Sequence, residues 1–137
     1  MDVAFGDMLI STDSSRLDQD RIYELLSTTY WAGHRPMNKV RKSIEHSLCY
    51  GVYQGDRQIG FARVITDWTT TYWLCDVVID ADFRGQGIGK KLIDTIVRSD
   101  DLQGLSGFLG TADAHGLYEQ YGFVKDANRF MVRRPSS

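Results

Sequence analysis

The stretch of residues 77–93 limits most strongly what this chain can fold into. It opens with Val-Val-Ile at positions 77–79, a β-branched run that is typical of a strand buried on both faces. Glycine then occupies every second position from 85 to 89, and apolar residues recur at helical spacing over 88–97. The stretch therefore predicts a strand, a glycine loop and a helix in direct succession.

The predicted loop has the features of an anion site. Free N–H groups and the helix dipole converge where a glycine loop enters a helix. Lys90 and Lys91 fall in the first helical turn, where each cation faces the positive end of the dipole and costs about 0.3–1 kcal/mol. Arg84 adds a third positive charge. A bound polyanion would turn this cost into stabilisation; the alternative is an ordinary turn with solvated lysines.

The spacing of the loop residues excludes two common nucleotide-binding motifs. The dinucleotide fingerprint G-x-G-x-x-G would need glycine where Lys90 stands, and a P-loop would need Ser or Thr where Lys91 stands. The pattern R-x-x-G-x-G, from Arg84 through Gly87 to Gly89, resembles instead the pyrophosphate loop of the GNAT acetyltransferase superfamily. The segment Y-x-x-x-G-F at residues 118–123 is similar to a second mark of that family.

The order of predicted elements, β-α-α-β-β-β-α-β-α-β, is similar to the GNAT fold over nearly the whole chain. Strands are predicted at residues 8–10, 49–53, 59–65, 72–79, 123–124 and 129–132, and one more lies within 102–111 and ends near 111. Helices are predicted after Asp18 and Pro36, over 88–97 and over 112–121. The resemblance implies a mixed α/β fold whose central sheet has about six to seven strands flanked by about four helices. No repeat or linker divides residues 1–137, which predicts one domain.

Composition restricts the function classes further. The chain is 137 residues long, 42% hydrophobic and 25% charged, enough for one domain with a core. Its net charge of −2 gives no electrostatic case for a nucleic acid or a membrane partner. No apolar stretch approaches the roughly 20 residues that span a bilayer, and the N-terminus lacks a signal-peptide pattern, so we expect a cytoplasmic protein.

Cysteine and histidine usage gives no sign of a metal site. Cys49 and Cys75 lie in apolar runs and are expected to be buried free thiols, with a disulfide as the alternative. The histidines at 34, 46 and 115 are too scattered to share a metal. An exposed edge strand could pair two copies, so a monomer and a homodimer both remain open.

The family resemblance implies acetyl-coenzyme A as the co-substrate and an amine as the acceptor. Backbone groups around residues 77–79 would hold the pantetheine arm, and N–H groups from 84 to 90 would hold the diphosphate. The cofactor-binding residues implied are Val77, Val78, Ile79, Arg84, Gly85, Gln86, Gly87, Ile88, Gly89 and Lys90.

Acetyl transfer to an amine needs a base and an acid. An alkyl amine with a pKa of ~10.4 is only about 1 part in 2,500 neutral at pH 7, a penalty of roughly 4.6 kcal/mol. The departing thiolate in turn profits from a proton donor. Tyr118 is the candidate general acid, by resemblance to the tyrosine of the family segment. The alternative is a tyrosine that packs its ring under the sheet and satisfies its hydroxyl locally.

Asp76 is the candidate base or amine-binding residue. It is a carboxylate inside an apolar strand, where an unpartnered charge is costly. The alternative is a structural ion pair, for example with Arg63 on the neighbouring strand. Asp67, at a strand end, and a chain of water molecules are the other candidates for the base.

The acceptor is expected to contact the first two helices and the turn before the central strand. The conspicuous side chains there are Trp31, His34, Arg35, Trp68 and Tyr72. Their rings would suit a cationic amine, while Arg35 would suit a substrate with a carboxylate. The alternative is that Trp31 and Trp68 complete the core.

The resemblance implies an acetyl-coenzyme A-dependent N-acetyltransferase. We expect direct transfer in a ternary complex, since neither motif contains a cysteine for an acyl-enzyme. A non-catalytic acyl-coenzyme A-binding regulatory module is the alternative. A nucleotide-binding domain is a third possibility, which the two failed glycine motifs disfavour.

Overall fold

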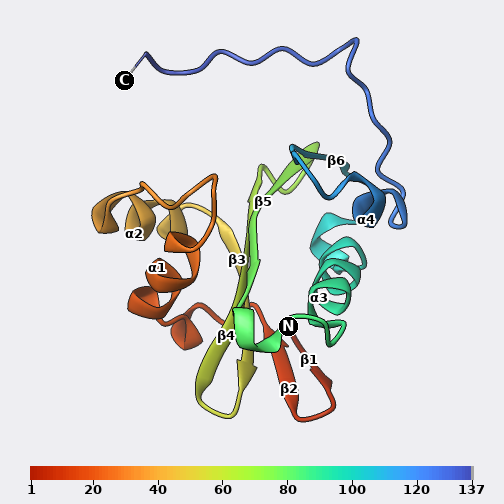
Figure 1. Ribbon diagram of the computed structural model, residues 1–137. Helices are drawn as coiled ribbons and strands as arrows, with labels where there is room; N and C mark the ends of the chain where they lie inside the picture. Colours follow the sequence, from red (N-terminus) through yellow and green to blue (C-terminus); the bar gives the residue numbers. More distant parts are fainter. Residues whose placement is uncertain (137) are drawn as a thin grey trace.

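A computed structural model, which describes residues 1–136, contains a six-stranded sheet with helices on both faces (Figure 1). The strands are β1 (Asp2–Phe5), β2 (Met8–Ser11), β3 (Leu48–Gln54), β4 (Arg57–Thr66), β5 (Thr71–Ile79) and β6 (Ser106–Leu109). The α-helices are α1 (Gln19–Ser27), α2 (Met37–Glu45), α3 (Ile88–Val97) and α4 (His115–Glu119). The strands follow one another in chain order, β1 to β5 antiparallel and β6 parallel to β5. The mixed α/β fold expected from the sequence is confirmed.

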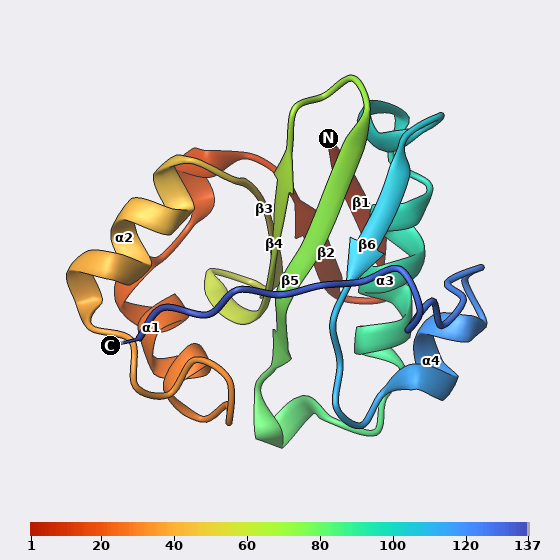
Figure 2. The same ribbon diagram turned by 90° about the horizontal axis from the view of Figure 1, so that it is seen from above.

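The helices divide into two layers. Helices α1 and α2 cover one face of the sheet, and α3 and α4 lie on the other, as Figures 1 and 2 show. Two apolar cores result. Phe61 and Val78 pack with Ile22 on the α1 side, whereas Leu74 packs with Leu92 on the α3 side. Burial of each helix stripe against the sheet therefore fixes both layers.

Local residue chemistry accounts for several element boundaries. The Asp18 carboxylate accepts a hydrogen bond from the amide of Arg21, 3.1 Å away, and so caps α1 as predicted. Pro36 precedes the first residue of α2. Gly55, with φ +57°, closes the β3–β4 hairpin in the left-handed region that glycine adopts readily.

A bulge interrupts β5 at Asp76. Its φ of +57° is rare for a residue other than glycine, and the pairing register with β4 shifts beside it. Tyr72 and Leu74 face α3, but Val78, which alternation would place on the same side, faces α1. Because an extra residue reverses the alternation, the bulge turns the Asp76 side chain toward the loop that joins α1 and α2.

Strands β5 and β6 separate after a short paired region. Thr71–Leu74 of β5 pairs with Ser106–Leu109 of β6, and the next half of β5 has no partner in β6 (Figure 2). The β5 edge from Cys75 to Ile79 is therefore left open toward the space between the two strands. The structure thus has a splayed strand pair at this edge.

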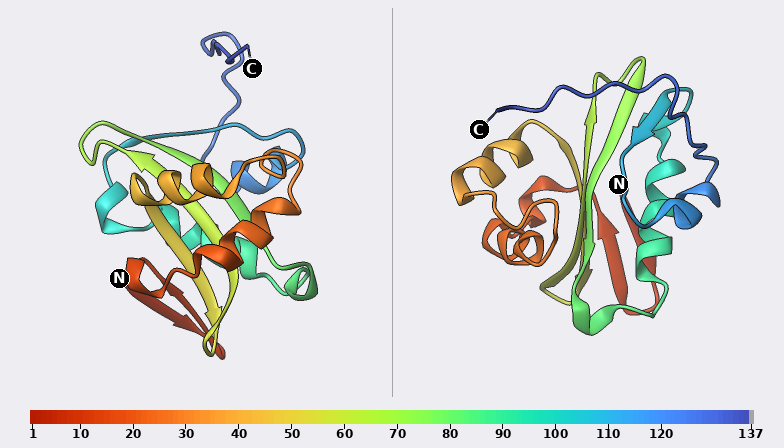
Figure 3. Two further views of the ribbon diagram at one scale, coloured as in Figure 1. Left: turned by 90° about the vertical axis from the view of Figure 1, so that its left-hand side faces the viewer. Right: turned by 45° about the horizontal axis from the view of Figure 1, so that its top comes forward.

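Both ends of the chain differ from prediction. The first strand is β1, which pairs with β2 through a turn at Gly6 (φ +57°); its short apolar pattern gave too little periodicity to be recognised. Residues 123–124 and 129–132, predicted as strands, are not strands. The segment after α4 crosses above the ends of the strands toward the side of α2 (Figures 1 and 3). It finds no ladder partner among the described residues, although Phe130 stacks on Trp73 with ring centroids 5.8 Å apart. Strand formation needs a partner strand, which local sequence does not supply.

Among residues 1–136, no helix has the length and apolar character needed to cross a bilayer.

Candidate active site

A cleft of about 620 Å³ opens where β5 and β6 separate. Its walls are the loop between α1 and α2, the open half of β5, the start of α3, and α4 with the loop before it. The residues that line it include Thr28, Tyr30, Trp31, Arg35, Cys75, Asp76, Val77, Val78, Ile79, Arg84, Gly89, Thr111, Asp113 and Tyr118. The cleft therefore brings the glycine loop, Asp76 and Tyr118 to one place.

The glycine loop presents unused backbone donors. The amides of residues 85–90 make no hydrogen bond to any described residue, and the first bond of α3 runs from the amide of Lys91 to the carbonyl of Gly87. Gly87 stands at the N-cap with φ +80°, and no side chain caps the helix. A β-carbon at Gly87 would meet no other atom within 4 Å. The loop is thus open above and can accept an anion with its main-chain amides.

Asp80 fixes the start of this loop. Its carboxylate accepts from the amide of Asp82, 2.8 Å away, and from the guanidinium of Arg21 on α1. Arg57 of the β3–β4 hairpin adds a longer contact of 3.4 Å. Arg84 donates from Nε to the carbonyl of Ile79 at 3.2 Å. These contacts hold the strand end and the loop entrance in one geometry while the loop amides remain free.

Asp76 is a buried residue with three donors on its carboxylate. Its Oδ2 accepts from Arg63 Nε and from Arg35 Nη1, each 2.8 Å away, and its Oδ1 accepts from Trp31 Nε1 at 3.0 Å. The ion pair with Arg63 that the sequence allowed is therefore present. The pairing with Arg35 and Trp31 joins positions more than 40 residues apart and had no sequence signal.

The donors determine the protonation state of Asp76. Burial opposes ionisation, but the hydrogen bonds and charges of Arg35 and Arg63 outweigh it and hold the pKa of the Asp76 carboxyl below its ordinary value. A carboxylate that three donors occupy and whose pKa is lowered is a weak base. These contacts favour the structural alternative for Asp76.

The segment Y-x-x-x-G-F has a clear structural basis. Gly122, with φ +88°, ends α4, and the amide of Phe123 bonds the carbonyl of Tyr118 at 3.3 Å while that of Gly122 bonds the carbonyl of Glu119 at 3.2 Å. This is a Schellman motif, which commonly brings together apolar residues at its two ends. The rings of Tyr118 and Phe123 meet edge to face, 6.0 Å apart. The motif therefore fixes the ring of Tyr118.

The hydroxyl of Tyr118 is left available. It makes no hydrogen bond to a described residue, and the single buried unpaired side-chain oxygen or nitrogen among residues 1–136 belongs to Tyr53. Burial of the ring, followed by the charge of Asp113, raises the pKa of Tyr118 above its ordinary value of 10.0. The hydroxyl therefore keeps its proton at neutral pH and reaches open space.

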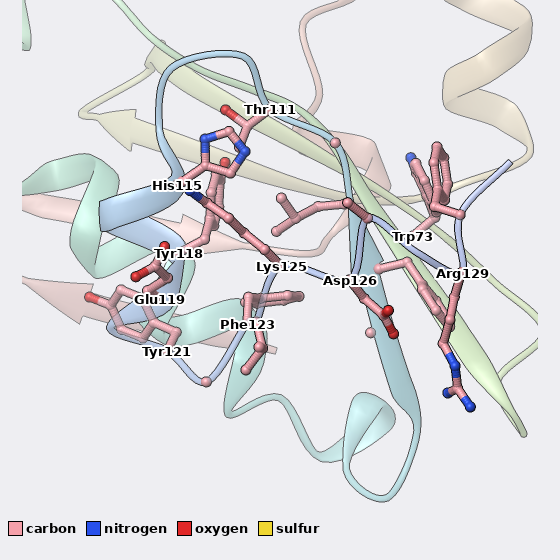
Figure 4. A pocket seen from close by; sticks show the side chains of 18 of the residues that line it. Trp73, Thr111, His115, Tyr118, Glu119, Tyr121, Phe123, Lys125, Asp126 and Arg129 are labelled. Atoms are coloured by element: carbon pink, nitrogen blue, oxygen red, sulfur yellow. The ribbon is translucent and has the colours of Figure 1, made fainter. Parts of the chain in front are cut away.

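A second cavity of about 590 Å³ adjoins the cleft on the other side of α4. Figure 4 shows it between α4, Trp73 and the segment that follows Phe123. Tyr118 lines both cavities. Arg84, Gly89 and Asp76 line the first cavity and not the second, so the cleft at the glycine loop is the candidate active site.

The other predicted residues are divided between the cleft and the rest of the molecule. Asp67 lies in the β4–β5 turn, where its carboxylate accepts hydrogen bonds from the Thr70 hydroxyl and from the amides of residues 69–71. These hydrogen bonds lower the pKa of the Asp67 carboxyl. Trp68 lies in that turn, 53% exposed, neither in the core nor in the cleft. Tyr72 is buried toward α3, and His34 is exposed and does not line the cleft. Trp31 and Arg35 are the expected acceptor contacts that do line it.

Sequence reasoning missed Tyr30 and Asp113. The Tyr30 hydroxyl accepts from the amide of Ala112 at 3.4 Å, which joins the α1–α2 loop to the loop before α4. Asp113 is exposed and lines the cleft next to Tyr118. Both lie outside the observed helices, although Asp113 falls within the helix predicted over 112–121, and no chemical motif marked either side chain as part of a site.

Both cysteines are free thiols. Burial raises the pKa of Cys75, which lines the cleft, to about 11 and that of Cys49 to about 12. Each therefore remains a protonated, weakly nucleophilic thiol at neutral pH. Within residues 1–136, no three His, Cys, Asp or Glu side chains gather as a metal-binding group.

Comparison with known proteins identifies the family. Residues 45–125, more than half of the chain, match the family model described as acetyltransferase (GNAT) domain. The chain belongs to the GNAT acetyltransferase family. The match spans β3 through α4 and includes both the glycine loop and the Y-x-x-x-G-F segment, so the resemblance seen in the sequence is confirmed.

Solved GNAT structures agree with the fold. A protein of Xanthomonas campestris pv. campestris assigned to the GNAT family is 41% identical, with a TM-score of 0.90 over 96% of both chains. An aminoglycoside 6'-N-acetyltransferase complexed with coenzyme A is 21% identical, with a TM-score of 0.63 over 74% of this chain and 61% of that one. At 21% identity, the similarity to the aminoglycoside 6'-N-acetyltransferase supports a common fold alone.

Curated GNAT relatives are longer than this chain. An uncharacterized N-acetyltransferase, ycf52-like, from Prochlorococcus marinus is 34% identical over 115 residues, which cover 79% of this chain. The chain spans about two thirds or less of the length of such relatives, with 66%, 63% and 60% in three cases.

Proposed function

We propose that this GNAT protein is an acetyl-coenzyme A-dependent N-acetyltransferase that passes the acetyl group directly to a primary amine in a ternary complex. The observation that supports this most is the row of unbonded amides at residues 85–90 beside the open edge of β5. A diphosphate would accept from these amides, and the pantetheine arm would lie along residues 77–79. Acetyl-coenzyme A would supply the activated acyl group.

The residues of the cleft would divide the proton transfers among them. The amine nitrogen attacks the thioester carbonyl carbon, the carbon–sulfur bond breaks, and the Tyr118 hydroxyl gives its proton to the departing sulfur. We assign Asp76 a positioning role, because its carboxylate is occupied by Arg35, Arg63 and Trp31. Asp113, whose carboxylate is exposed in the cleft, is the remaining acidic group that could take the proton of the amine, directly or through water.

Direct attack is supported over a covalent intermediate on cysteine. Cys75 is the cysteine that lines the cleft, and its thiol donates toward the carbonyl of Arg63 at 3.3 Å. With a pKa of about 11, fewer than about 1 in 1,000 such thiols is ionised at pH 7.

Two measurements test the proposal. Calorimetry with coenzyme A is expected to detect binding, and a thiol-release assay with acetyl-coenzyme A over amines, aminoglycosides and short peptides is expected to detect turnover. Absence of both contradicts the proposal. Binding without turnover on any acceptor would support a non-catalytic acyl-coenzyme A module instead.

Replacing Gly87 with Ala is expected to weaken coenzyme A binding about 10-fold. A β-carbon makes the left-handed conformation cost about 1–2 kcal/mol, so the loop relaxes and its amides no longer converge. Isothermal calorimetry measures the change. Gly104 is a matched control, since its φ is +81° and its β-carbon would also meet open space, but it lies beyond the far end of α3. Gly104→Ala should lose similar stability and keep its affinity within about 2-fold; equal losses of affinity in both variants would contradict the loop assignment.

A further inference from the structure

The wall of the cleft formed by the α1–α2 loop and β5 has an unbalanced charge. Arg35 and Arg63 both bond to Oδ2 of Asp76, and neither has an ion pair with another acidic group among residues 1–136. Two guanidinium groups and one carboxylate leave one positive charge. A positive charge that is partly withdrawn from water favours a nearby anion.

The two arginines differ in how many of their N–H groups are hydrogen-bonded within the protein. Arg63 also donates from Nη1 to the Ser47 hydroxyl at 3.1 Å, its side chain is 12% exposed, and it does not line the cleft. Arg35 lines the cleft, is 23% exposed, and makes a single side-chain hydrogen bond within the described chain, the one to Asp76. Its other N–H groups are not among the buried unpaired atoms. Arg35 therefore presents the unpaired positive charge to the cleft.

The remaining charged groups of the cleft lie elsewhere. Arg84 is at the glycine loop, where it would face the diphosphate, and Asp113 lies next to Tyr118 on α4. The cleft is thus positive at the α1–α2 loop and negative near Tyr118. A polyamine would meet no free carboxylate at the α1–α2 wall, because Asp76 is already occupied by three donors.

On this arrangement we propose that the acceptor is an amine that also bears a carboxylate, such as a free amino acid, and that Arg35 binds the carboxylate. The inference rests on the proposed N-acetyltransferase function and specifies its substrate class. Planar guanidinium groups bind carboxylates through paired N–H donors, and Arg35 has donors left for this. With the carboxylate held there, the amine is directed toward the middle of the cleft, between Arg35 and Tyr118.

Paired acceptors test this directly. Each common amino acid and its carboxamide are compared in the thiol-release assay with acetyl-coenzyme A. We expect kcat/KM to be at least about 10-fold higher for the preferred acids than for their amides. The amine of a carboxamide has a lower pKa than the amine of the corresponding acid, so more of it is neutral at pH 7. A preference for the acid therefore cannot result from ionisation of the amine. Amides or amines without a carboxylate that react equally well overturn the proposal.

The variant Arg35→Gln separates carboxylate binding from fold. We expect about a 10- to 100-fold loss in kcat/KM for acids, chiefly through KM, and a much smaller loss for amides, so that the preference disappears. Arg41→Gln is the matched control, because Arg41 is a 53% exposed arginine of α2 outside the cleft, and it should keep the preference. Equal loss for acids and amides in Arg35→Gln indicates a structural role alone and overturns the proposal.

A binding measurement needs no turnover and distinguishes failure of this inference from failure of the proposed function. N-acetyl amino acids and their amides are titrated by calorimetry into the protein saturated with coenzyme A, or into the free protein if coenzyme A does not bind. Tighter binding of the acids that is lost in Arg35→Gln supports the carboxylate site even if no acceptor is turned over. Equal affinity for acids and amides overturns the carboxylate site, while coenzyme A binding and turnover of other amines would leave the transferase function standing.

Discussion

Replacing Asp76 with Asn is expected to lower the free energy of unfolding by about 3–5 kcal/mol, because it leaves the partly buried cations of Arg35 and Arg63 without their counter-ion. Asn has nearly the same shape, so the change removes charge rather than volume. Urea denaturation measures the effect, and the melting temperature should fall by roughly 10–20 °C. The control Asp94→Asn breaks an exposed pair with Arg98 and should cost less than about 0.5 kcal/mol. If Asp76→Asn lowers the free energy of unfolding as little as this control does, the ion-pair assignment is contradicted.

The same pair predicts a definite pH dependence. The folded pKa of Asp76 is lowered, so its stabilising contribution is fully present above the ordinary value of 3.8 and is lost as pH falls through the lower folded value. The stability difference between wild type and Asp76→Asn should therefore be constant from about pH 5 to pH 8 and shrink only below about pH 4. A difference that titrates near neutrality would contradict the lowered pKa.

Kinetics of Asp76→Asn test the base role that the sequence allowed. A positioning residue leaves the alkaline-rising limb of the pH–rate profile in place, although turnover falls. Disappearance of that limb, in a variant that is still folded at the assay temperature, would restore Asp76 as the base.

Replacing Tyr118 with Phe is expected to reduce turnover by about 100- to 10,000-fold while coenzyme A affinity changes by less than about 2-fold. The ring and its contact with Phe123 are kept, and only the hydroxyl, which has no partner in the described chain, is removed. Steady-state kinetics and calorimetry together measure the separation. Unchanged turnover would remove Tyr118 from the reaction.

The same helix end offers a control for Tyr118→Phe. Tyr121 donates its hydroxyl to the carbonyl of Lys90 at 3.1 Å, and Tyr121→Phe should change turnover by no more than about 3-fold. In the wild type, the acid form of Tyr118 is required and its pKa is raised, so activity should not decline on the alkaline side until above pH 10. A decline between pH 8 and pH 9 would point to a different proton donor.

Elements whose causes are local were predicted correctly from the sequence. The strand, glycine loop and helix over residues 77–97 depend on β-branched residues, glycine spacing and a 3.6-residue apolar period, all of which lie within the stretch itself. The same holds for the Asp18 cap and for the β3–β4 hairpin. The two family motifs fall in this class, which is why family and fold followed from the residues alone.

The position of Asp76 was decided by tertiary structure. Its charge and its place in an apolar strand marked it, but the side on which it lies depends on a bulge against β4. Its pairing with Arg35 crosses 41 positions and depends on how the α1–α2 loop packs on the sheet. A backbone irregularity and a long-range ion pair leave no periodic trace in the sequence.

The C-terminal segment is a second case in which local sequence did not decide the structure. Residues 129–132 have the composition of a strand, yet Met131 is 93% exposed and the segment pairs with nothing among the described residues. A helix makes its hydrogen bonds within its own residues, so its sequence largely determines it. A strand is completed by a distant partner. The chain by itself therefore determined its helices, its glycine loop and its family, whereas pairing at the sheet edges and the charge arrangement in the cleft were decided only by the folded structure.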